Sequence, residues 1–278
     1  MNTVERDGEN LRRTRRAGVE LAFRVCGEGI PVVLLHGTSA NFAVWEPVAT
    51  ALAPRATVVT LDQRGHGRSD KPDAGYDGAA FADDVVTVLD ALNLQRAVIA
   101  GHSLGARNAW VTAARHPQRV AAVVAVDYVP YVEARVLDTL QTRVASGNRV
   151  FADVPEIEDY LQRRYPRMPA NAVARRARWG YRLRDEGGWV PLATPAALEQ
   201  VVEGLRTPWD EEFRTVRTPM TCMRGVDSAI VSPAAWARAQ QDRPDARWVV
   251  IDDADHYVPE EHPDAVVGEI LRILDGID

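Results

Sequence analysis

The sequence predicts an α/β fold in which a mostly parallel central sheet is flanked by helices and interrupted by one helical insertion. Apolar runs of strand length alternate with segments of helical periodicity along most of the chain. This alternation is typical of a parallel sheet with right-handed crossovers. It stops between residues 130 and 209 and then resumes. With 278 residues, 46% of them hydrophobic, the chain can form one core and one sizeable insertion.

The strands expected in the first half of the chain are apolar runs bounded by turn residues. Residues 19–25 alternate apolar and polar side chains, as expected of a half-exposed strand. Unbroken apolar runs predict central strands covered on both faces, at 31–35, 56–61, 97–100 and 120–126. Helical spacing lies between them, at 43–52, 81–92 and 106–114.

The second half begins with the break in this pattern. Between residues 130 and 209 no strong buried strand is predicted, and helical segments rich in arginine and aromatic residues run between prolines. The alternation resumes with strands at 220–224 and 248–251 and helices at 233–241 and 265–274. We therefore predict a core of residues 1–129 and 211–278 and a helical cap of residues 130–210. Such a cap would cover the C-terminal edge of the sheet, where open α/β sheets bind ligands.

The link between the predicted strand at 97–100 and the helix at 106–114 has the sequence Gly-His-Ser-Leu-Gly, residues 101–105. A strand that turns directly into a helix forces its corner residue into a strained conformation, and flanking glycines let strand and helix approach closely. Ser103 therefore projects its hydroxyl from the sheet edge at a helix N-terminus, where backbone N–H groups can hold an oxyanion. We predict that Ser103 is a nucleophile.

Charge and composition exclude several classes of partner. The net charge is −6 and no basic stripe is interleaved with aromatic residues, so nucleic acid is not an expected partner. The charged first residues do not resemble a signal peptide, and the apolar runs are too short to cross a bilayer. The two isolated cysteines, Cys26 and Cys222, have no metal-ligand spacing. We therefore expect a cytoplasmic protein without membrane contact, metal or cofactor.

Five motifs together resemble those of the α/β-hydrolase family with a helical cap, and the resemblance covers nearly the whole chain. They are His-Gly-Thr at 36–38, Asp-Gln-Arg-Gly-His-Gly-Arg-Ser at 62–69, Gly-His-Ser-Leu-Gly at 101–105, Arg-Gly-Val-Asp-Ser at 224–228 and Asp-His-Tyr-Val-Pro at 255–259. The resemblance implies a serine hydrolase whose oxyanion hole is made by the backbone N–H groups of Leu104 and Thr38. Because this fold hosts many chemistries, the motifs do not choose a substrate.

The family order of nucleophile, acid and histidine implies that His256 is the base. Of the six histidines, only His256 follows the last predicted strand, in the loop that reaches back over the sheet edge. Two aspartates compete for the role of the acid that orients its ring. Asp127 ends the strand after the nucleophile, and Asp227 follows the penultimate strand. Position in the sequence leaves both alternatives open.

The cap resembles a narrower group, the (E)-2-(acetamidomethylene)succinate hydrolases of vitamin B6 breakdown. The resemblance rests on residues 126–134, 140–144, 160–166, 169–172 and 180–181. It implies that Arg143, Arg164 and Tyr165 bind the substrate, and planar bidentate donors suit a small dicarboxylate. Residues 130–210 contain 12 Arg against 11 Asp and Glu, so bulk charge by itself does not favour an anionic substrate.

The narrower resemblance also bears on the acid, because in that group the acid maps onto Asp127. The chain departs from the group at two positions. It has Asp227 where the group lacks an aspartate, and Thr38 where the group has an aliphatic residue. Either difference could mark a related enzyme with a different substrate.

We therefore predict a serine hydrolase that forms an acyl-enzyme from a small anionic amide or enamide of the acetamidomethylenesuccinate type and releases acetate and ammonia. Two enzymatic alternatives are a C–C bond hydrolase of meta-cleavage dienoates, which also needs arginines for carboxylates, and a general carboxylesterase. A non-enzymatic alternative is a hydrolase-like receptor for a small molecule. The expected partner is a small-molecule substrate, and the sequence does not choose between a monomer and a homodimer.

Overall fold

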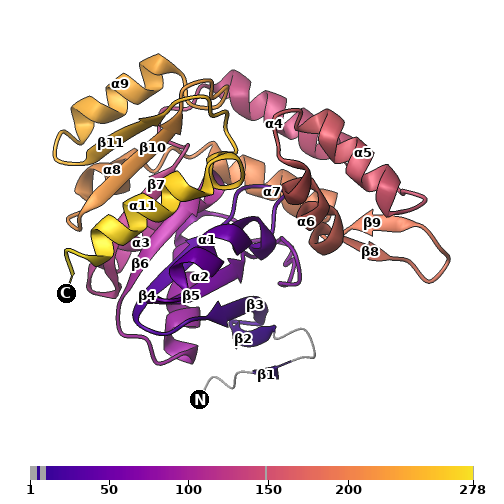
Figure 1. Cartoon of the computed structure of the whole chain (residues 1–278), viewed down its shortest axis with the longest axis horizontal. Helices are drawn as coiled ribbons and strands as arrows, with labels where there is room; N and C mark the ends of the chain where they lie inside the picture. Colours follow the sequence, from indigo (N-terminus) through magenta and orange to yellow (C-terminus); the bar gives the residue numbers. More distant parts are fainter. Residues whose placement is uncertain (1–4, 7–10, 148, 278) are drawn as a thin grey trace.

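The computed structural model describes residues 5, 6, 11–147 and 149–277 and contains one large mixed sheet (Figure 1). In chain order its strands are β1 (Glu5–Arg6), β2 (Arg12–Arg16), β3 (Val19–Cys26), β4 (Ile30–Leu35), β5 (Ala56–Asp62), β6 (Ala97–His102), β7 (Val120–Val126), β10 (Met220–Gly225) and β11 (Arg247–Ile251). Across the sheet they follow the order β1-β2-β3-β5-β4-β6-β7-β10-β11. The three pairings from β1 to β5 are antiparallel, and all the others are parallel. The predicted α/β fold with a mostly parallel sheet is confirmed.

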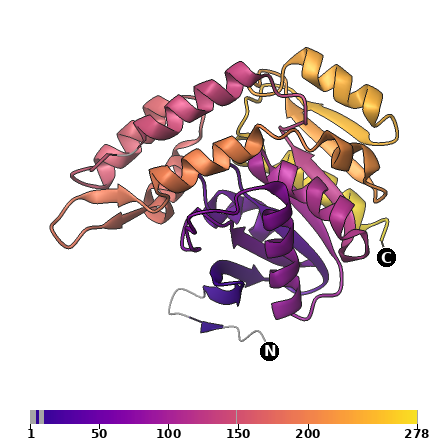
Figure 2. The same cartoon turned by 180° about the vertical axis from the view of Figure 1, so that it is seen from behind.

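Helices cover both faces of this sheet (Figures 1 and 2). One face packs against α2 (Gly78–Ala91), α3 (Leu104–Arg115), α8 (Asp210–Thr215) and α9 (Pro233–Asp242). The other face packs against α1 (Glu46–Leu52), α10 (Val258–Glu261) and α11 (Pro263–Leu274). Two 3-10 turns, η1 (Phe42–Trp45) and η2 (Pro117–Arg119), precede α1 and β7. The predicted helix at 43–52 is thus divided between η1 and α1.

The unbroken apolar runs are explained by burial on both faces. In β4, Val33 and Leu35 belong to the core under α2 and α3, while Val32 and Leu34 belong to the core under α1 and α11. All four side chains are fully buried. Burial of apolar surface at roughly 25 cal/mol per Å² is the main driving force for such a sheet.

The inserted segment, which we define as residues 130–210, joins β7 to α8 and β10. Its elements are α4 (Ala134–Ser146), α5 (Val154–Arg164), α6 (Ala170–Gly180), β8 (Tyr181–Leu183), β9 (Trp189–Pro191) and α7 (Pro195–Leu205). It extends to one side of the sheet in Figures 1 and 2 and has a small core of its own, which includes Phe151 and Ile157. The predicted domain boundaries at 130 and 210 stay a prediction.

The sequence did not predict the β8–β9 hairpin of the inserted segment. Each strand has three residues, none of them fully buried, which is too short for an alternating pattern to be recognised. The connection contains Gly187 and Gly188, both at positive φ. Among the described residues, no helix is long and apolar enough to cross a membrane.

Candidate active site

Ser103 stands at the corner between β6 and α3 with φ 54° and ψ −116°, a region that a non-glycine residue adopts only under strain. The two flanking glycines make this corner sterically feasible. A Cβ atom on Gly101 would lie 2.0 Å from the carbonyl oxygen of Gly105, and one on Gly105 would lie 2.1 Å from that of Leu35. The turn predicted from the sequence is therefore present, and Ser103 is the N-cap residue of α3.

His256 lies against Asp127, at the C-terminal end of β7. The Nδ1 atom of His256 is 2.6 Å from Oδ2 of Asp127, whose side chain is fully buried. Asp127 also accepts hydrogen bonds from the backbone N–H of Gly225 at 2.9 Å and from the hydroxyl of Ser228 at 2.5 Å. These donors fix the carboxylate, which in turn holds the Nδ1–H tautomer of His256. The Nε2 atom of His256 is then left to accept a proton.

Ser103 and His256 line one cavity of about 530 Å³, counted with the open space at its mouth. The other residues that line it are Gly37, Thr38, Ala40, His102, Tyr128, Val136, Leu137, Leu140, Arg143, Arg176, Leu205, Ile230 and Tyr257. Within the described part of the chain, no hydrogen bond joins the Ser103 hydroxyl to His256. Catalytic hydrogen bonds are often long in a free enzyme and shorten when substrate binds.

Asp227 lies elsewhere, although it follows the neighbouring strand β10. Its side chain is 54% exposed and accepts a hydrogen bond from Nη1 of Arg167 at 2.7 Å. Arg167 also donates to the side chain and the carbonyl oxygen of Asp253. Of the two aspartates that the sequence left open, the structure brings Asp127 to His256 and places Asp227 in an exposed ion pair.

The residues predicted for the oxyanion hole, Leu104 and Thr38, lie on two elements that meet beside Ser103. Leu104 is the first residue of α3, so its N–H has no intrahelical acceptor. Thr38 follows β4 and lines the Ser103 cavity, and its hydroxyl is buried without a partner among the described residues. Leu104 is not among the residues that line this cavity, so its part in an oxyanion hole stays a prediction.

A hydrogen-bonded chain connects the loop of Thr38 to α3. The backbone N–H of Gln63 donates to Nε2 of His36 at 3.0 Å, and the Gln63 amide donates to the carbonyl oxygen of His36 at 2.6 Å. Asn108 of α3 donates to the other end of the same amide at 2.6 Å. Burial, followed by the nearby His66, keeps the pKa of His36 well below its ordinary value. His36 is therefore neutral and can accept the Gln63 bond.

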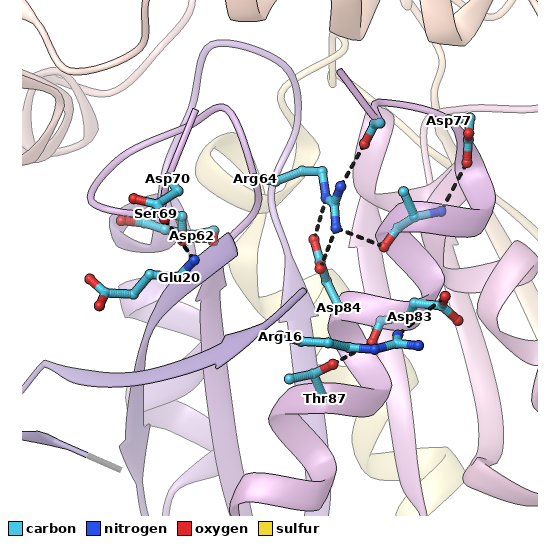
Figure 3. Close-up of polar contacts among 12 residues, drawn as sticks. Arg16, Glu20, Asp62, Arg64, Ser69, Asp70, Asp77, Asp83, Asp84 and Thr87 are labelled. Atoms are coloured by element: carbon cyan, nitrogen blue, oxygen red, sulfur yellow. Dashed lines mark hydrogen bonds and ion pairs between the residues drawn. The ribbon is translucent and has the colours of Figure 1, made fainter. Parts of the chain in front are cut away.

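Polar contacts anchor the loop that contains Gln63 on both sides (Figure 3). Arg64 forms a bidentate pair with Asp84 of α2, with both distances 2.6 Å. On the other side, the backbone N–H of Glu20 donates to Asp70 at 2.8 Å. These contacts account for a long loop that is buried and ordered next to the site.

His102 holds the loop of His256 in place. Its Nε2 atom is 2.7 Å from the carbonyl oxygen of His256 and donates to it. Burial, and then the neighbouring His256, lower the pKa of His102 well below its ordinary value. The neutral ring therefore has a single N–H, and this contact uses it.

The three residues predicted to bind substrate do not all line the Ser103 cavity. Arg143 does, whereas Arg164 and Tyr165 line a second cavity next to it. Arg164 donates to the Tyr165 hydroxyl at 3.2 Å and to the carbonyl oxygen of Arg143 at 2.6 Å. The two cavities share Ala40, Arg143 and Arg176 as walls.

Arg176, on α6, was not predicted from the sequence. It forms a buried bidentate pair with Glu260 of α10. Nothing in the local sequence distinguishes it from its neighbours Arg175 and Arg178, because only the docking of α6 on α10 gives it a partner. Burial raises the pKa of Tyr165, but the positive charges of Arg176, Arg164 and Arg143 outweigh burial, so its pKa is lowered overall.

Metal ligands are not grouped in the part of the chain that the structure describes, where no three His, Cys, Asp or Glu side chains could hold an ion together. Cys26 is exposed and Cys222 is buried, and both are free thiols.

The chain belongs to the α/β-hydrolase family, whose family model matches residues 30–263. It is 42% identical over 265 residues to 2-(acetamidomethylene)succinate hydrolase of Mesorhizobium japonicum, and the match covers 95% of each chain. The crystal structure of an E-2-(acetamidomethylene)succinate hydrolase superposes with a TM-score of 0.92 at 41% identity and covers 95% of this chain and 98% of that one. The hydrolase class and the narrower resemblance predicted from the sequence are confirmed.

A more distant relative is 2-hydroxymuconate semialdehyde hydrolase of Pseudomonas sp. strain CF600. It is 35% identical over 124 residues, which cover 43% of this chain and 44% of the relative. A thioesterase domain from a curacin biosynthetic pathway superposes with a TM-score of 0.80 at 22% identity and covers 97% of this chain and 100% of that domain. That likeness shows the shared fold alone.

Proposed function

We propose that this enzyme hydrolyses the amide bond of (E)-2-(acetamidomethylene)succinate or of a closely related small dicarboxylic enamide. One observation carries the proposal. Two adjoining cavities, one of them lined by Ser103, have Arg143, Arg164 and Arg176 in their walls, and neither lining includes an Asp or Glu within the described residues. A water-accessible wall with three guanidinium groups and no carboxylate favours a small dianion.

The charge balance of this wall supports a dianion in particular. Arg176 is neutralised by Glu260. In contrast, Arg143 and Arg164 have no carboxylate partner within the described chain. Arg164 donates only to hydroxyl and carbonyl oxygens. Two uncompensated positive charges therefore match the two negative charges of a dicarboxylate, which would complete their hydrogen bonding.

In the proposed reaction Ser103 Oγ attacks the amide carbonyl while Nε2 of His256 takes its proton. Asp127 holds the ring and stabilises the imidazolium that forms. The negative oxygen of the tetrahedral intermediate receives hydrogen bonds from the N–H groups of Leu104 and Thr38. His256 then gives its proton to the departing nitrogen, which leaves an acetyl-serine and an enamine.

A water molecule, deprotonated by His256, then attacks the acetyl-serine and releases acetate and free Ser103. The amide step consumes one water. The enamine that leaves reacts with a second water to give ammonia and an aldehyde. Its carboxyl group β to the aldehyde is then lost as carbon dioxide, which leaves succinate semialdehyde. This second part is solution chemistry of the product and needs no residue of the chain.

A substrate panel tests the proposal against its rivals. Wild type and Ser103→Ala are assayed with (E)-2-(acetamidomethylene)succinate, a meta-cleavage dienoate and p-nitrophenyl acetate. We expect kcat/KM to be highest for the dicarboxylic enamide and the Ser103→Ala variant to lose at least about 10³-fold of that activity. Turnover of the aryl ester alone would instead identify the protein as a general carboxylesterase. Binding of these compounds without turnover of any of the three would identify it as a receptor.

A C–C bond hydrolase of dienoates is the second candidate, because the same arginines would suit the dienoate carboxylate and because a 2-hydroxymuconate semialdehyde hydrolase is among the relatives. Preferred turnover of the dienoate in the panel would establish it. We further propose that residues 130–210 act as a cap over Ser103. Limited proteolysis with and without succinate tests this cap through protection of the segment on binding.

We also propose that the enzyme works in the cytoplasm, which the two unpaired thiols support, since cytoplasmic conditions keep cysteines reduced. Fractionation of cells that express the full chain tests the location. A homodimer is the second arrangement that the sequence left open, and sedimentation of the purified chain distinguishes it from a monomer.

A further inference from the structure

Arg176 is held rigidly where the two cavities meet. Its Nε and Nη2 atoms donate to the two oxygens of Glu260 at 2.8 and 2.5 Å, and the side chain is 7% exposed. Its guanidinium carbon lies 4.9 Å from the ring centre of Tyr165 and 5.3 Å from that of Tyr257. A bidentate pair between two aromatic rings leaves the guanidinium little freedom to rotate.

The third nitrogen of this guanidinium, Nη1, takes no part in the pair with Glu260. The Nη1 atom of Arg176 has no acceptor in the described part of the chain, and it is not one of the fully covered unpaired atoms. Arg176 lines both cavities, and the other residues that do so are Ala40 and Arg143. The Arg143 guanidinium likewise has no acceptor among the described residues. Two arginines that line both cavities therefore have guanidinium N–H groups without an acceptor in the described part of the chain.

Glu260 keeps Arg176 charged in this buried place. Burial by itself lowers the pKa of Arg176, but the Glu260 carboxylate more than offsets burial and raises that pKa above the ordinary arginine value. The pKa of His102 is low mainly because its ring is buried, and the positive charge of Arg176 lowers that pKa further. Glu260 itself lies four residues after His256, so the pair joins the inserted segment to the histidine loop.

We propose that Nη1 of Arg176 and the guanidinium of Arg143 form a carboxylate subsite at the junction of the two cavities, with Glu260 as the positioning residue that aims Arg176. The subsite takes one carboxylate of a small dicarboxylate, while the amide carbonyl lies over Ser103. This inference rests on the proposed function, because it names how one end of the dicarboxylic substrate is recognised.

The test must separate binding from folding. Arg176→Gln alone leaves the Glu260 carboxylate buried and unpaired, which is strongly destabilising. The double variant Arg176→Gln/Glu260→Gln removes both charges and keeps side chains of similar size. Arg167→Gln is the matched control, because Arg167 also joins the inserted segment to the loops around His256 through carboxylates but lines neither cavity.

Succinate binding is measured by titration calorimetry, with neutral succinamide as the second ligand and thermal melting as the check on folding. We expect the Kd of succinate to rise at least tenfold in the double variant, and by less than twofold in Arg167→Gln. Glu260→Gln, which keeps the arginine but loosens it, should raise the succinate Kd by a smaller factor.

Two results would overturn the subsite. One is an unchanged succinate Kd in a double variant that melts cooperatively, and the other is an equal loss of succinate and succinamide binding. A wild-type chain that does not bind succinate would also overturn it. Because the readout is binding, failure of the wild type to hydrolyse (E)-2-(acetamidomethylene)succinate would reject the proposed function and leave this test intact.

Discussion

The Nδ1 atom of His256 lies 2.6 Å from Oδ2 of Asp127, a buried contact between residues 129 positions apart in the chain. Asp227, which follows the adjacent strand, pairs instead with the exposed Arg167. Two carboxylates at the same edge of one sheet thus occupy opposite environments.

Asp127→Asn is expected to lower kcat by about 10³- to 10⁴-fold, because the amide no longer holds the Nδ1–H tautomer of His256 or stabilises the imidazolium. Asp227→Asn, the matched control, should change kcat by less than about threefold, since an exposed ion pair contributes about 0–1 kcal/mol. Steady-state kinetics on the best substrate of the panel measures both. Equal losses in the two variants would contradict the assignment of Asp127.

Gly105→Ala is expected to destabilise the chain by about 1–3 kcal/mol or more, because the added Cβ would lie 2.1 Å from the carbonyl oxygen of Leu35. Gly268→Ala is the control. Gly268 lies within α11, and a Cβ there would meet nothing within 4 Å. That variant should gain about 0.5–1 kcal/mol from helix propensity. Urea unfolding measures the two free energies, and a stable Gly105→Ala chain would show that strand and helix need not approach so closely.

Arg143→Met should raise KM for the dicarboxylate by about 10- to 100-fold, since a hydrogen bond to a charged group contributes about 1.5–3 kcal/mol. The control is Arg163→Met, because Arg163 is exposed on α5 and lines neither cavity. KM and kcat are measured separately for each variant. Similar changes in the two variants would mean that general surface charge, rather than the cavity wall, attracts the substrate.

The KM for the dicarboxylate should rise as the pH increases through the ionisation of Tyr165. Its pKa lies below the ordinary tyrosine value of 10, because Arg176, Arg164 and Arg143 outweigh burial. The phenolate would cancel part of the positive charge that faces the substrate, and Tyr257, whose pKa burial raises, stays neutral beside it. A bound dianion favours the neutral phenol, so affinity is full below this pKa and is lost above it.

Tyr165→Phe removes the ionising group and should abolish this alkaline rise in KM. The pH dependence of KM, measured for wild type and variant on the same substrate, provides the comparison. An identical rise in both would assign it to another group.

The fold could be predicted because its signals are local. Central strands such as β4 bury side chains on both faces, so a continuous apolar run indicates them directly. The corner at Ser103 has its own signature, since only glycine fits at 101 and 105. The short hairpin of β8 and β9 lacks any such signal, because three half-exposed residues carry no recognisable period.

The site could be predicted only in part, for a physical reason. Asp127 and Asp227 both follow strands that end at the same edge, and their sequences do not record that Ser228 and Gly225 would donate to the first. Arg176 is likewise one arginine among several on its helix. Its partner Glu260 is 84 residues away, and the contact exists only after the inserted segment has docked.

Ser103 and Asp127 share an unusual backbone conformation, with φ near +54° and +53°. Each is held there by its own N–H, which donates to the next strand: Ser103 to Val126 of β7, and Asp127 to Met223 of β10, both at 2.8 Å. The position of Ser103 therefore depends on β7, and the end of β7 depends in turn on β10. The backbone geometry at Ser103 thus depends on a strand, β10, that lies more than a hundred residues away in the chain.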